Sequence, residues 1–393
     1  MSRPPFEVAD IIRQYGKAFI ENNRSWLTWQ HLRVLDRIEH CRTAALGGHI
    51  DGCSRCGYRA DISYNSCGSR HCPKCLTHAR DLWLAERSKE CLPVGYFHVV
   101  FTLPHQLSWL ALQNKKFVYH LLFRASAATL LEVTADPRHL GAEIGFLSVL
   151  HTWGQTLQAH PHVHCIIPAG GLSTDHRQWV HPRYAFLPVK VLSKVFRGKF
   201  MAGLKRAFRR GMLQLPGSLE AISTEKAFRA FVRTLYHQNW VVYAKPPFGG
   251  PEHVLHYLAR YTHRVAISNH RLLNVADGKV TFRWRDYAHG NKQRKMTLTA
   301  EEFLRRFLLH VLPKGFIRIR FFGFLAARRR GTLLPLCFRL LANHPRPPSS
   351  LPPQPSSIWR CPRCGGPMIL IDKLTAQQIL WRSVGLRSFI DTS

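Results

Sequence analysis

The sequence predicts an α+β protein with a small metal-binding module near its N-terminus. Segments with helical spacing of apolar residues are interspersed with short apolar strands that end at proline or at polar turns. Six of the 11 cysteines fall between Cys41 and Cys75, in a Gly-rich stretch without a long periodic segment. The chain of 393 residues is too long for one small core and suits two or three domains.

The elements follow from this periodicity in chain order. Residues 1–40 and 81–95 have helical spacing, whereas residues 41–80 hold too little apolar material to fold without metal. Strands are expected at 97–103, at 144–153 and 163–167 around a polar turn, and at 280–284. Further helices are expected within 107–133, 188–213, 253–266 and 301–311. A Pro-rich linker at 345–355 precedes a short tail with its own Cys pair.

The charge balance favours a polyanionic partner. The chain has 56 Lys and Arg against 23 Asp and Glu, a formal net charge of +33. Nucleic acid relieves such self-repulsion and releases counterions on binding. An anionic membrane surface is the alternative, but the basic residues are spread along the chain instead of along one amphipathic helix. Residues 1–7 lack the apolar core of a signal peptide, and no apolar stretch is long enough for a bilayer, so we expect a cytoplasmic protein.

The clustered cysteines predict structural zinc. Without a signal peptide, paired cysteines indicate metal ligation and not disulfides. Cys53 and Cys56 are separated by two residues, as are Cys72 and Cys75, and two such pairs complete a tetrahedral thiolate shell. We therefore expect these four sulfurs to share one ion. Further candidate ligands for a second zinc are Cys41, His49, Cys67 and His71, although for His49 an ordinary surface role is equally compatible with the sequence.

A second metal motif consists of histidines. On a strand His162 and His164 project from one face, and two imidazoles on a rigid strand form a platform for a divalent ion. His151 would lie near His164 if the two strands form a hairpin, and Gln155 is the competing third ligand. Taken alone the motif is weak, because the chain has 23 histidines.

A pair of tyrosines provides candidate nucleophiles. Tyr257 and Tyr261 are four residues apart, so on a helix both hydroxyls lie on one face, and Arg260 and Arg264 follow the same spacing and could hold phosphates. A phenol can attack a phosphodiester when a metal polarises a non-bridging oxygen. In isolation, two tyrosines packed against a core are the better explanation of this spacing.

Together these motifs resemble the rolling-circle transposases of bacterial insertion sequences, in the family named after insertion sequence ninety-one, within the wider class of HUH endonucleases. The resemblance runs in order from roughly Cys41 to Leu341. It is carried by residues 41–49, 65–67 and 70–75 (zinc module), 97–104 (first strand), 150–155 and 160–164 (metal motif), 257–261 (two-tyrosine motif), and 313–320 with 323–325 (basic segment).

The resemblance implies an antiparallel sheet flanked by helices, with the histidines on a central strand. It implies cleavage of single-stranded DNA to a 5′-phosphotyrosine and a free 3′-hydroxyl, with Tyr257 and Tyr261 as nucleophiles and Mg²⁺ or Mn²⁺ at His162, His164 and His151. The partners would be single-stranded transposon ends and target DNA at the bacterial nucleoid, with no small-molecule substrate; a homo-oligomer is left open. A non-catalytic zinc-dependent DNA-binding protein and a replication initiator are the alternatives.

We expect three segments along the chain. Residues 1–95 would hold the N-terminal helices and the zinc module, residues 96–343 the catalytic domain, and residues 344–393 the linker and tail. The basic stretches 199–210 and 318–330 are expected to contact the DNA backbone. In the tail, Cys361 and Cys364 form half a zinc site, so they are either a remnant or borrow ligands from elsewhere.

Overall fold

The structure is a computed structural model, and it describes residues 4–75, 83–182, 187–245, 266–287, 289–342 and 359–388. The chain forms two compact units. Unit 1 comprises Met1–Ala79, His263–Val311 and Ser350–Ser393, and unit 2 comprises Arg80–Thr262 and Leu312–Ser349. Unit 1 therefore draws on all three of the segments expected along the chain. In the part that the structure describes, no helix combines the length and the apolar character needed to span a membrane.

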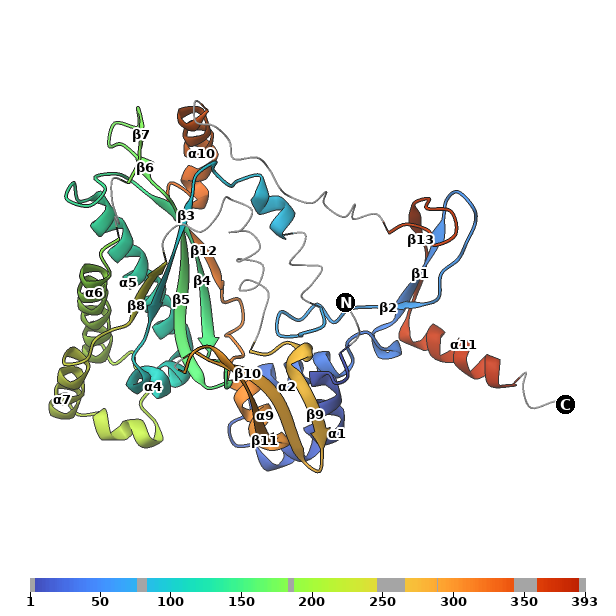
Figure 1. Ribbon diagram of the computed structural model, residues 1–393. Helices are drawn as coiled ribbons and strands as arrows, with labels where there is room; N and C mark the ends of the chain where they lie inside the picture. The colour runs from blue at the N-terminus through green and yellow to red at the C-terminus, as the bar shows by residue number, and fades with distance from the viewer. Residues whose placement is uncertain are drawn as a thin grey trace. The chain divides into compact units, whose positions relative to one another are not determined.

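Unit 2 is built on a five-stranded antiparallel sheet (Figure 1). Its strands, in spatial order, are β12 (Ile319–Gly323), β4 (Gly145–Trp153), β5 (Ala159–Pro168), β3 (Tyr96–Thr102) and β8 (Val242–Lys245). Every neighbouring pair is antiparallel. β4 and β5 form the hairpin that the sequence predicts, and because β12 and β3 flank them, both strands have a partner on each side.

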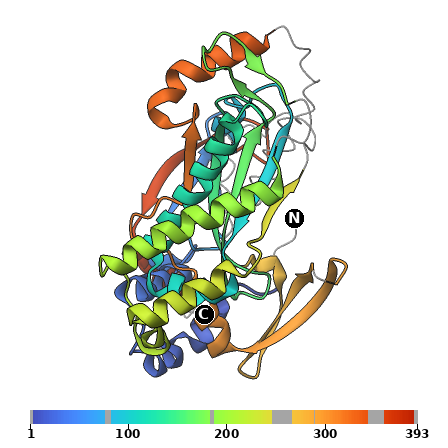
Figure 2. The ribbon, with the colours of Figure 1, turned by 90° about the vertical axis from the view of Figure 1, so that its left-hand side faces the viewer.

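Helices cover one face of this sheet and form the main core with it. In Figure 2, α6 and α7 lie in front of the sheet. The helices of this layer are α4 (Ser108–Gln113), α5 (Lys115–Ala135), α6 (Val189–Arg209) and α7 (Glu225–Tyr236). Phe101 on β3, Phe123 on α5 and Phe196 on α6 are fully buried in this core. Ser126 and Thr129 are also buried on α5, and each donates its hydroxyl hydrogen to a backbone carbonyl four residues earlier, which satisfies both groups.

A smaller cluster closes one end of unit 2. It is formed by the hairpin of β6 (Gly171–Leu172) and β7 (Trp179–Val180) and by α10 (Ala327–Leu341), which packs against β7. Phe324, at the turn between β12 and α10, is fully buried there, and its ring is 6.0 Å from that of Trp179. The basic residues at 313–320 did not predict a strand, but pairing with β4 from Gly145 to Val149 makes 319–323 the edge of the sheet.

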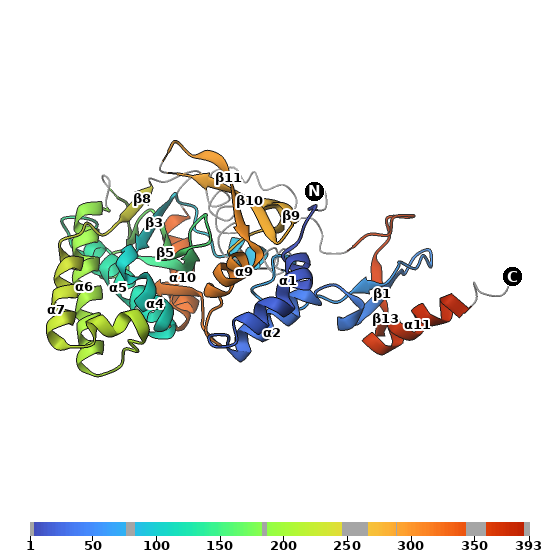
Figure 3. The ribbon, with the colours of Figure 1, turned by 90° about the horizontal axis from the view of Figure 1, so that it is seen from below.

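Unit 1 contains two small sheets, four α-helices and two short 3-10 helices among its described residues. One group consists of α1 (Val8–Asn22), α2 (Trp29–Glu39), α9 (Ala300–Leu309) and the strands β9 (Leu272–Ala276), β10 (Lys279–Asp286) and β11 (Lys292–Thr299). α1 packs against α2 and α9, as Figure 3 also shows. The other group has the sheet order β13-β1-β2 and consists of β1 (Gly48–Cys53), β2 (Ser63–Tyr64), β13 (Met368–Leu374), the short helix η1 (Ala44–Leu46) and α11 (Ala376–Ser388). The tail thus adds a strand to the N-terminal module.

The turn after β12 requires glycine. Gly323 has a φ of +61°, and a Cβ at this position would overlap the carbonyl oxygen of Ile144. Gly315 has a similar φ of +71°, but nothing lies within 4 Å of its Cβ position. Alanine substitutions at these two glycines therefore distinguish the cost of backbone strain alone from the cost of strain together with steric overlap.

We predict that Gly323→Ala destabilises unit 2 by about 3–5 kcal/mol, because left-handed strain of about 1–2 kcal/mol adds to overpacking. The matched variant Gly315→Ala should lose only the strain, about 1–2 kcal/mol. Urea denaturation followed by tryptophan fluorescence measures both. Equal losses in the two variants would contradict the close approach of Gly323 to β4.

Candidate functional site

Three histidines from the two central strands of unit 2 meet on one face of the sheet. His151 on β4 is paired directly with His162 on β5, and Val149 is paired with His164. Residues opposite one another in an antiparallel pair project to the same side, as do residues two apart on one strand. The candidate ligand atoms of all three imidazoles lie within 4.8 Å of one another. Val163, between the two β5 histidines, points into the helical core instead.

Burial keeps the imidazoles of His162 and His164 neutral. The exposed fractions of His151, His162 and His164 are 4%, 9% and 6%. Desolvation, together with the neighbouring His160, lowers the pKa of His162 to about 3. Desolvation likewise holds the pKa of His164 well below its ordinary value. A neutral imidazole has a lone pair for a metal, so His162 and His164 are in the protonation state that metal binding requires.

Hydrogen bonds orient two of the rings. Nδ1 of His162 lies 2.6 Å from the carbonyl oxygen of His160, which can only accept, so Nδ1 carries the hydrogen and Nε2 the lone pair. Nδ1 of His164 lies 2.8 Å from Nε2 of His98 on β3. When Nδ1 of His164 donates to His98, Nε2 of His164 is left with its lone pair for a metal.

His98 is a site residue that the sequence did not single out. Its ring stacks on that of His164, with centroids 5.1 Å apart and planes 5° from parallel. Burial lowers the pKa of His98 to about 4, so it too is neutral and can accept a hydrogen bond. The signal available in the sequence was a single histidine inside an otherwise apolar strand. A histidine of this kind is more often a core residue whose ring nitrogens are hydrogen-bonded than a site residue. On β4, Trp153 stacks on His151 at 4.7 Å and supports the third ring.

The arrangement can hold one divalent ion. Three imidazoles fit Mn²⁺ and heavier first-row ions better than Mg²⁺, which prefers oxygen ligands. Gln155, the competing third ligand, lies in the turn between β4 and β5. His151 lies on the strand itself, beside both other imidazoles.

The expected nucleophiles lie outside the described residues. Tyr257 and Tyr261 fall in residues 246–265, as do Arg260 and Arg264 and the helix expected at 253–266 in all but its last residue. Their assignment as catalytic and phosphate-binding residues stays a prediction.

Several arginines of the second expected DNA-binding stretch have partners within the protein. Arg320 lies over the ring of Phe123, 4.3 Å from its centroid. Nη2 of Arg329 donates to Glu143 at 2.9 Å, and Nη1 of Arg330 donates to Glu90 at 3.2 Å. These side chains hold β12 and α10 in place within unit 2. If this stretch contacts the DNA backbone, it must do so through its other basic residues or after these ion pairs rearrange.

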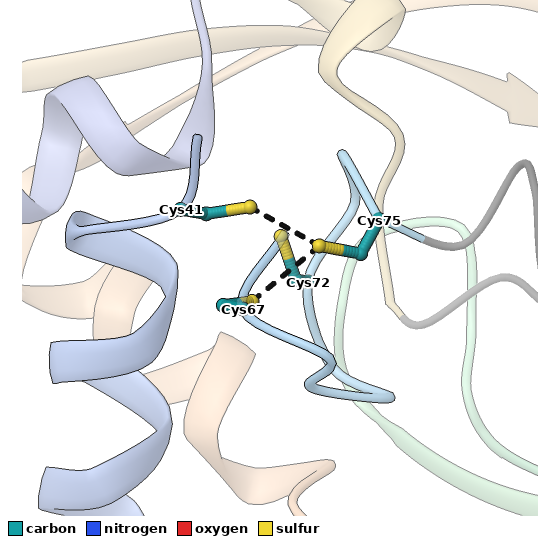
Figure 4. A group of neighbouring side chains, drawn as sticks. All are labelled: Cys41, Cys67, Cys72 and Cys75. Atoms are coloured by element: carbon teal, nitrogen blue, oxygen red, sulfur yellow. Dashed lines mark hydrogen bonds between the residues drawn. The ribbon is translucent and has the colours of Figure 1, made fainter. Parts of the chain in front are cut away.

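Four cysteines of unit 1 form a compact sulfur cluster (Figure 4). Cys41 comes just after α2, and Cys67, Cys72 and Cys75 come from the loops that follow β2. The sulfur of Cys75 lies 3.1 Å from that of Cys41 and 3.5 Å from that of Cys67. Four thiolates around one point complete a closed tetrahedral shell, the donor set of a structural zinc ion.

The expected grouping of the cysteines is wrong in one respect. Cys53 and Cys56 do not share a shell with Cys72 and Cys75, but lie with Cys361 and Cys364 of the tail. The spacing of a Cys pair fixes how its two sulfurs face one ion, and it does not determine which second pair completes the shell. Here the pairing of β13 with β1 brings the tail cysteines to Cys53.

The two candidate histidine ligands of the zinc module belong to neither sulfur cluster. Nδ1 of His49 on β1 lies 3.3 Å from the side-chain oxygen of Asn65, and its Nε2 lies 3.6 Å from Asp51. His71 is buried next to Cys72, with an exposed fraction of 4%. The second expected set of ligands is therefore divided. Its two cysteines, Cys41 and Cys67, join Cys72 and Cys75, which take the places expected for the two histidines.

Comparison with known proteins identifies the family. A family model described as "Transposase zinc-binding domain" matches residues 11–103, which include the cluster of Cys41, Cys67, Cys72 and Cys75. A second, described as "Putative transposase", matches residues 145–332, which include the three histidines. The sulfur cluster is thus a structural zinc site.

Two curated relatives extend over most of the chain. The "Putative transposase y4qJ" of Sinorhizobium fredii (strain NBRC 101917 / NGR234) is 52% identical over 385 residues, which cover 95% of this chain and 96% of that protein. The "Transposase for insertion sequence element IS801" of Pseudomonas savastanoi pv. phaseolicola is 30% identical over 329 residues, which cover 80% and 77%. With both its zinc-binding and its transposase regions matched, this DNA-acting chain belongs to the IS91 family of transposases.

Proposed function

We propose that this transposase cleaves and joins single-stranded DNA in rolling-circle transposition, through a 5′-phosphotyrosine formed on Tyr257 or Tyr261. The observation that carries the proposal is the group of three buried imidazoles of His151, His162 and His164 on the central hairpin of the sheet. Its DNA partners would be single-stranded transposon ends and target DNA.

The three histidines would hold a divalent ion, and their nitrogen donors favour Mn²⁺ over Mg²⁺. When bound, such an ion polarises a non-bridging phosphate oxygen and stabilises the charge that develops on it. The protein contributes rigidity: both strands are paired on each side, and hydrogen bonds or ring stacking support the three imidazoles. Ligands held in this way keep the scissile phosphate in a fixed orientation.

The covalent step exchanges one phosphodiester for another. The phenol oxygen of one tyrosine attacks phosphorus, the bond from phosphorus to the 3′-oxygen breaks, and the proton lost by the phenol is balanced by the one that the 3′-oxygen gains. The energy of the phosphodiester is kept, so a 3′-hydroxyl can later reverse the step on another strand. Two tyrosines allow cleavage and transfer to alternate.

A covalent-adduct assay tests this function. Labelled single strands from the ends of the element are mixed with the full chain and Mn²⁺ and run on a denaturing gel. We expect a protein-linked band for the wild type, at least 100-fold less of it for His162→Ala, and none for the double variant Tyr257→Phe/Tyr261→Phe. The single tyrosine variants show which phenol attacks first.

His237→Ala is the control, because His237 follows α7 in the helical layer, on the opposite face of the sheet from the three imidazoles, with an exposed side chain, and should leave the adduct intact. Loss of the adduct in this control, or an adduct that survives in the double tyrosine variant, would contradict the proposed chemistry. DNA binding without an adduct on any terminal strand would favour the non-catalytic DNA-binding alternative.

His98 provides a second prediction, for a positioning residue. Removing a hydrogen-bond partner of a ligating histidine typically weakens metal binding by about 10- to 100-fold. We expect His98→Ala to raise the Mn²⁺ concentration for half-maximal adduct formation by about that factor, with near wild-type yield at saturating Mn²⁺. His98→Gln, which still offers an acceptor, should recover most of the affinity. A yield that stays low at saturating Mn²⁺ would contradict a positioning role.

A further inference from the structure

The tail cysteines Cys361 and Cys364 lie outside the matched zinc-binding region at 11–103, and they join Cys53 and Cys56 from within that region in a second sulfur cluster. We propose that Cys53, Cys56, Cys361 and Cys364 hold a second structural zinc ion, which fastens the C-terminal residues 359–388 to strand β1. This inference is independent of the tyrosine chemistry proposed above.

The sulfur positions fit a tetrahedral zinc site. The sulfur of Cys53 lies 3.4 Å from that of Cys364, and the sulfur of Cys56 lies 3.6 Å from that of Cys361. All four lie within 4.8 Å of one another. Zinc with four Zn–S bonds of about 2.3 Å has its sulfurs about 3.8 Å apart, close to this spacing. Each short distance joins one N-terminal to one C-terminal cysteine, so neither pair forms a site alone.

The two halves of the cluster have the same backbone geometry. In the first, the N–H of Arg55 donates to the sulfur of Cys53 at 3.4 Å, and the N–H of Gly57 donates to the carbonyl of Cys53 at 3.1 Å. In the tail, the N–H of Arg363 donates to the sulfur of Cys361 at 3.4 Å, and the N–H of Gly365 donates to the carbonyl of Cys361 at 2.9 Å.

Glycine follows the second cysteine in both turns, with a φ of +69° at Gly57 and +67° at Gly365. This left-handed position lets each chain turn back while its two sulfurs face inward. N–H groups directed at sulfur stabilise thiolates, the form that binds zinc. Two equivalent turns facing each other are what a four-thiolate site requires, and chance proximity of two unrelated pairs does not predict this symmetry.

The backbone at Gly366 packs closely against the cluster. A Cβ there would lie 3.0 Å from the Cβ of Arg55 and 3.2 Å from the sulfurs of both Cys364 and Cys53, which is a tight contact. Strand pairing continues from this point. Cys53 pairs with Met368, and the register runs on to Gly48 opposite Leu374 with one bulge. The N–H of Ser54 donates to the carbonyl of Pro367 at 3.2 Å.

The tail has little apolar burial of its own. In its described part, Leu374 and Ile379 are buried, whereas Ile369, Leu370 and Ile371 on β13 remain 54%, 49% and 48% exposed. Cys56 and Cys361 are 305 residues apart in sequence, so the entropic cost of bringing the two ends together is high. The few buried side chains of the tail provide little stabilisation for this pairing. A metal ion bound by both Cys pairs adds its binding free energy to the stability of the folded tail.

Zinc analysis of the intact chain tests the site. The full-length protein, purified with zinc and reductant, is measured by native mass spectrometry and by elemental analysis. All samples carry His162→Ala, so that the three-histidine site contributes no zinc. In this background we expect two zinc ions per chain, and one after the further change Cys361→Ser/Cys364→Ser. Cys91→Ser, which changes a cysteine outside both clusters, should keep two. Cys364→His, which preserves a zinc ligand, should also keep two.

Hydrogen exchange on the same samples tests the fastening of the tail. In Cys361→Ser/Cys364→Ser, amide exchange over 368–374 should rise at least 10-fold, with no change over β10 and β11. Removal of zinc by a chelator should reproduce this in the protein that keeps both Cys pairs. One zinc ion per chain in the His162→Ala protein, two in the same protein with Cys361→Ser/Cys364→Ser, or a Cys53–Cys364 disulfide in the reduced protein would each overturn the proposal.

Discussion

The register between β4 and β5 is the constraint on which the candidate active site depends. It sets His151 opposite His162 and Val149 opposite His164, so that three imidazoles reach one point. A slip of one residue would turn the histidines of β5 into the helical core and expose Val163 to the opposite face. The apolar residues between the histidines therefore hold the site in place: Val163 and Cys165 are buried in the core that α5 and α6 form. The packing of Val163 and Cys165 on one face of the sheet thus determines the positions of the three histidines on the other face.

Burial of the histidines has a thermodynamic consequence. Desolvation lowers the pKa of His162 to about 3 and that of His98 to about 4, both below the ordinary value of 6.5. The unfolded chain takes up protons at these positions as the pH falls through about 6.5, while the folded chain does not until much lower pH. Their contribution to stability is therefore full above pH 6.5 and is lost as the pH falls toward 4 and then 3. Because neutral imidazoles do not have to lose a proton before they bind a metal, the same pKa shifts also favour cation binding.

Within unit 1 the cysteine-bearing loops rely on sulfur, whereas α1 and α9 bury apolar side chains such as Ile11, Phe303 and Phe307. Cys41, Cys67 and Cys72 are buried, and the loops that carry them contain little regular structure. A segment of this kind gains its folding free energy from the metal. The tail repeats the pattern, because β13 adds a largely exposed strand to β1 and begins beside a second group of four thiols. In these two parts of unit 1, stability is thus concentrated at the sulfur clusters.

The sequence by itself determined the α+β class, the positions of α1, α2, α5, α6 and α9, the β4–β5 hairpin and the shared face of His162 and His164, whereas α7 and α10 were not predicted. These depend on periodicity and on turn residues, which act over a few positions and can be read locally. The spacing within each Cys pair is local in the same sense. Tertiary structure decided what meets across long separations: Cys53 with Cys364, His98 with His164, and β12 with β4. Spacing carries no information on such encounters, because many pairings satisfy the same local pattern and only the packing of the whole chain selects one.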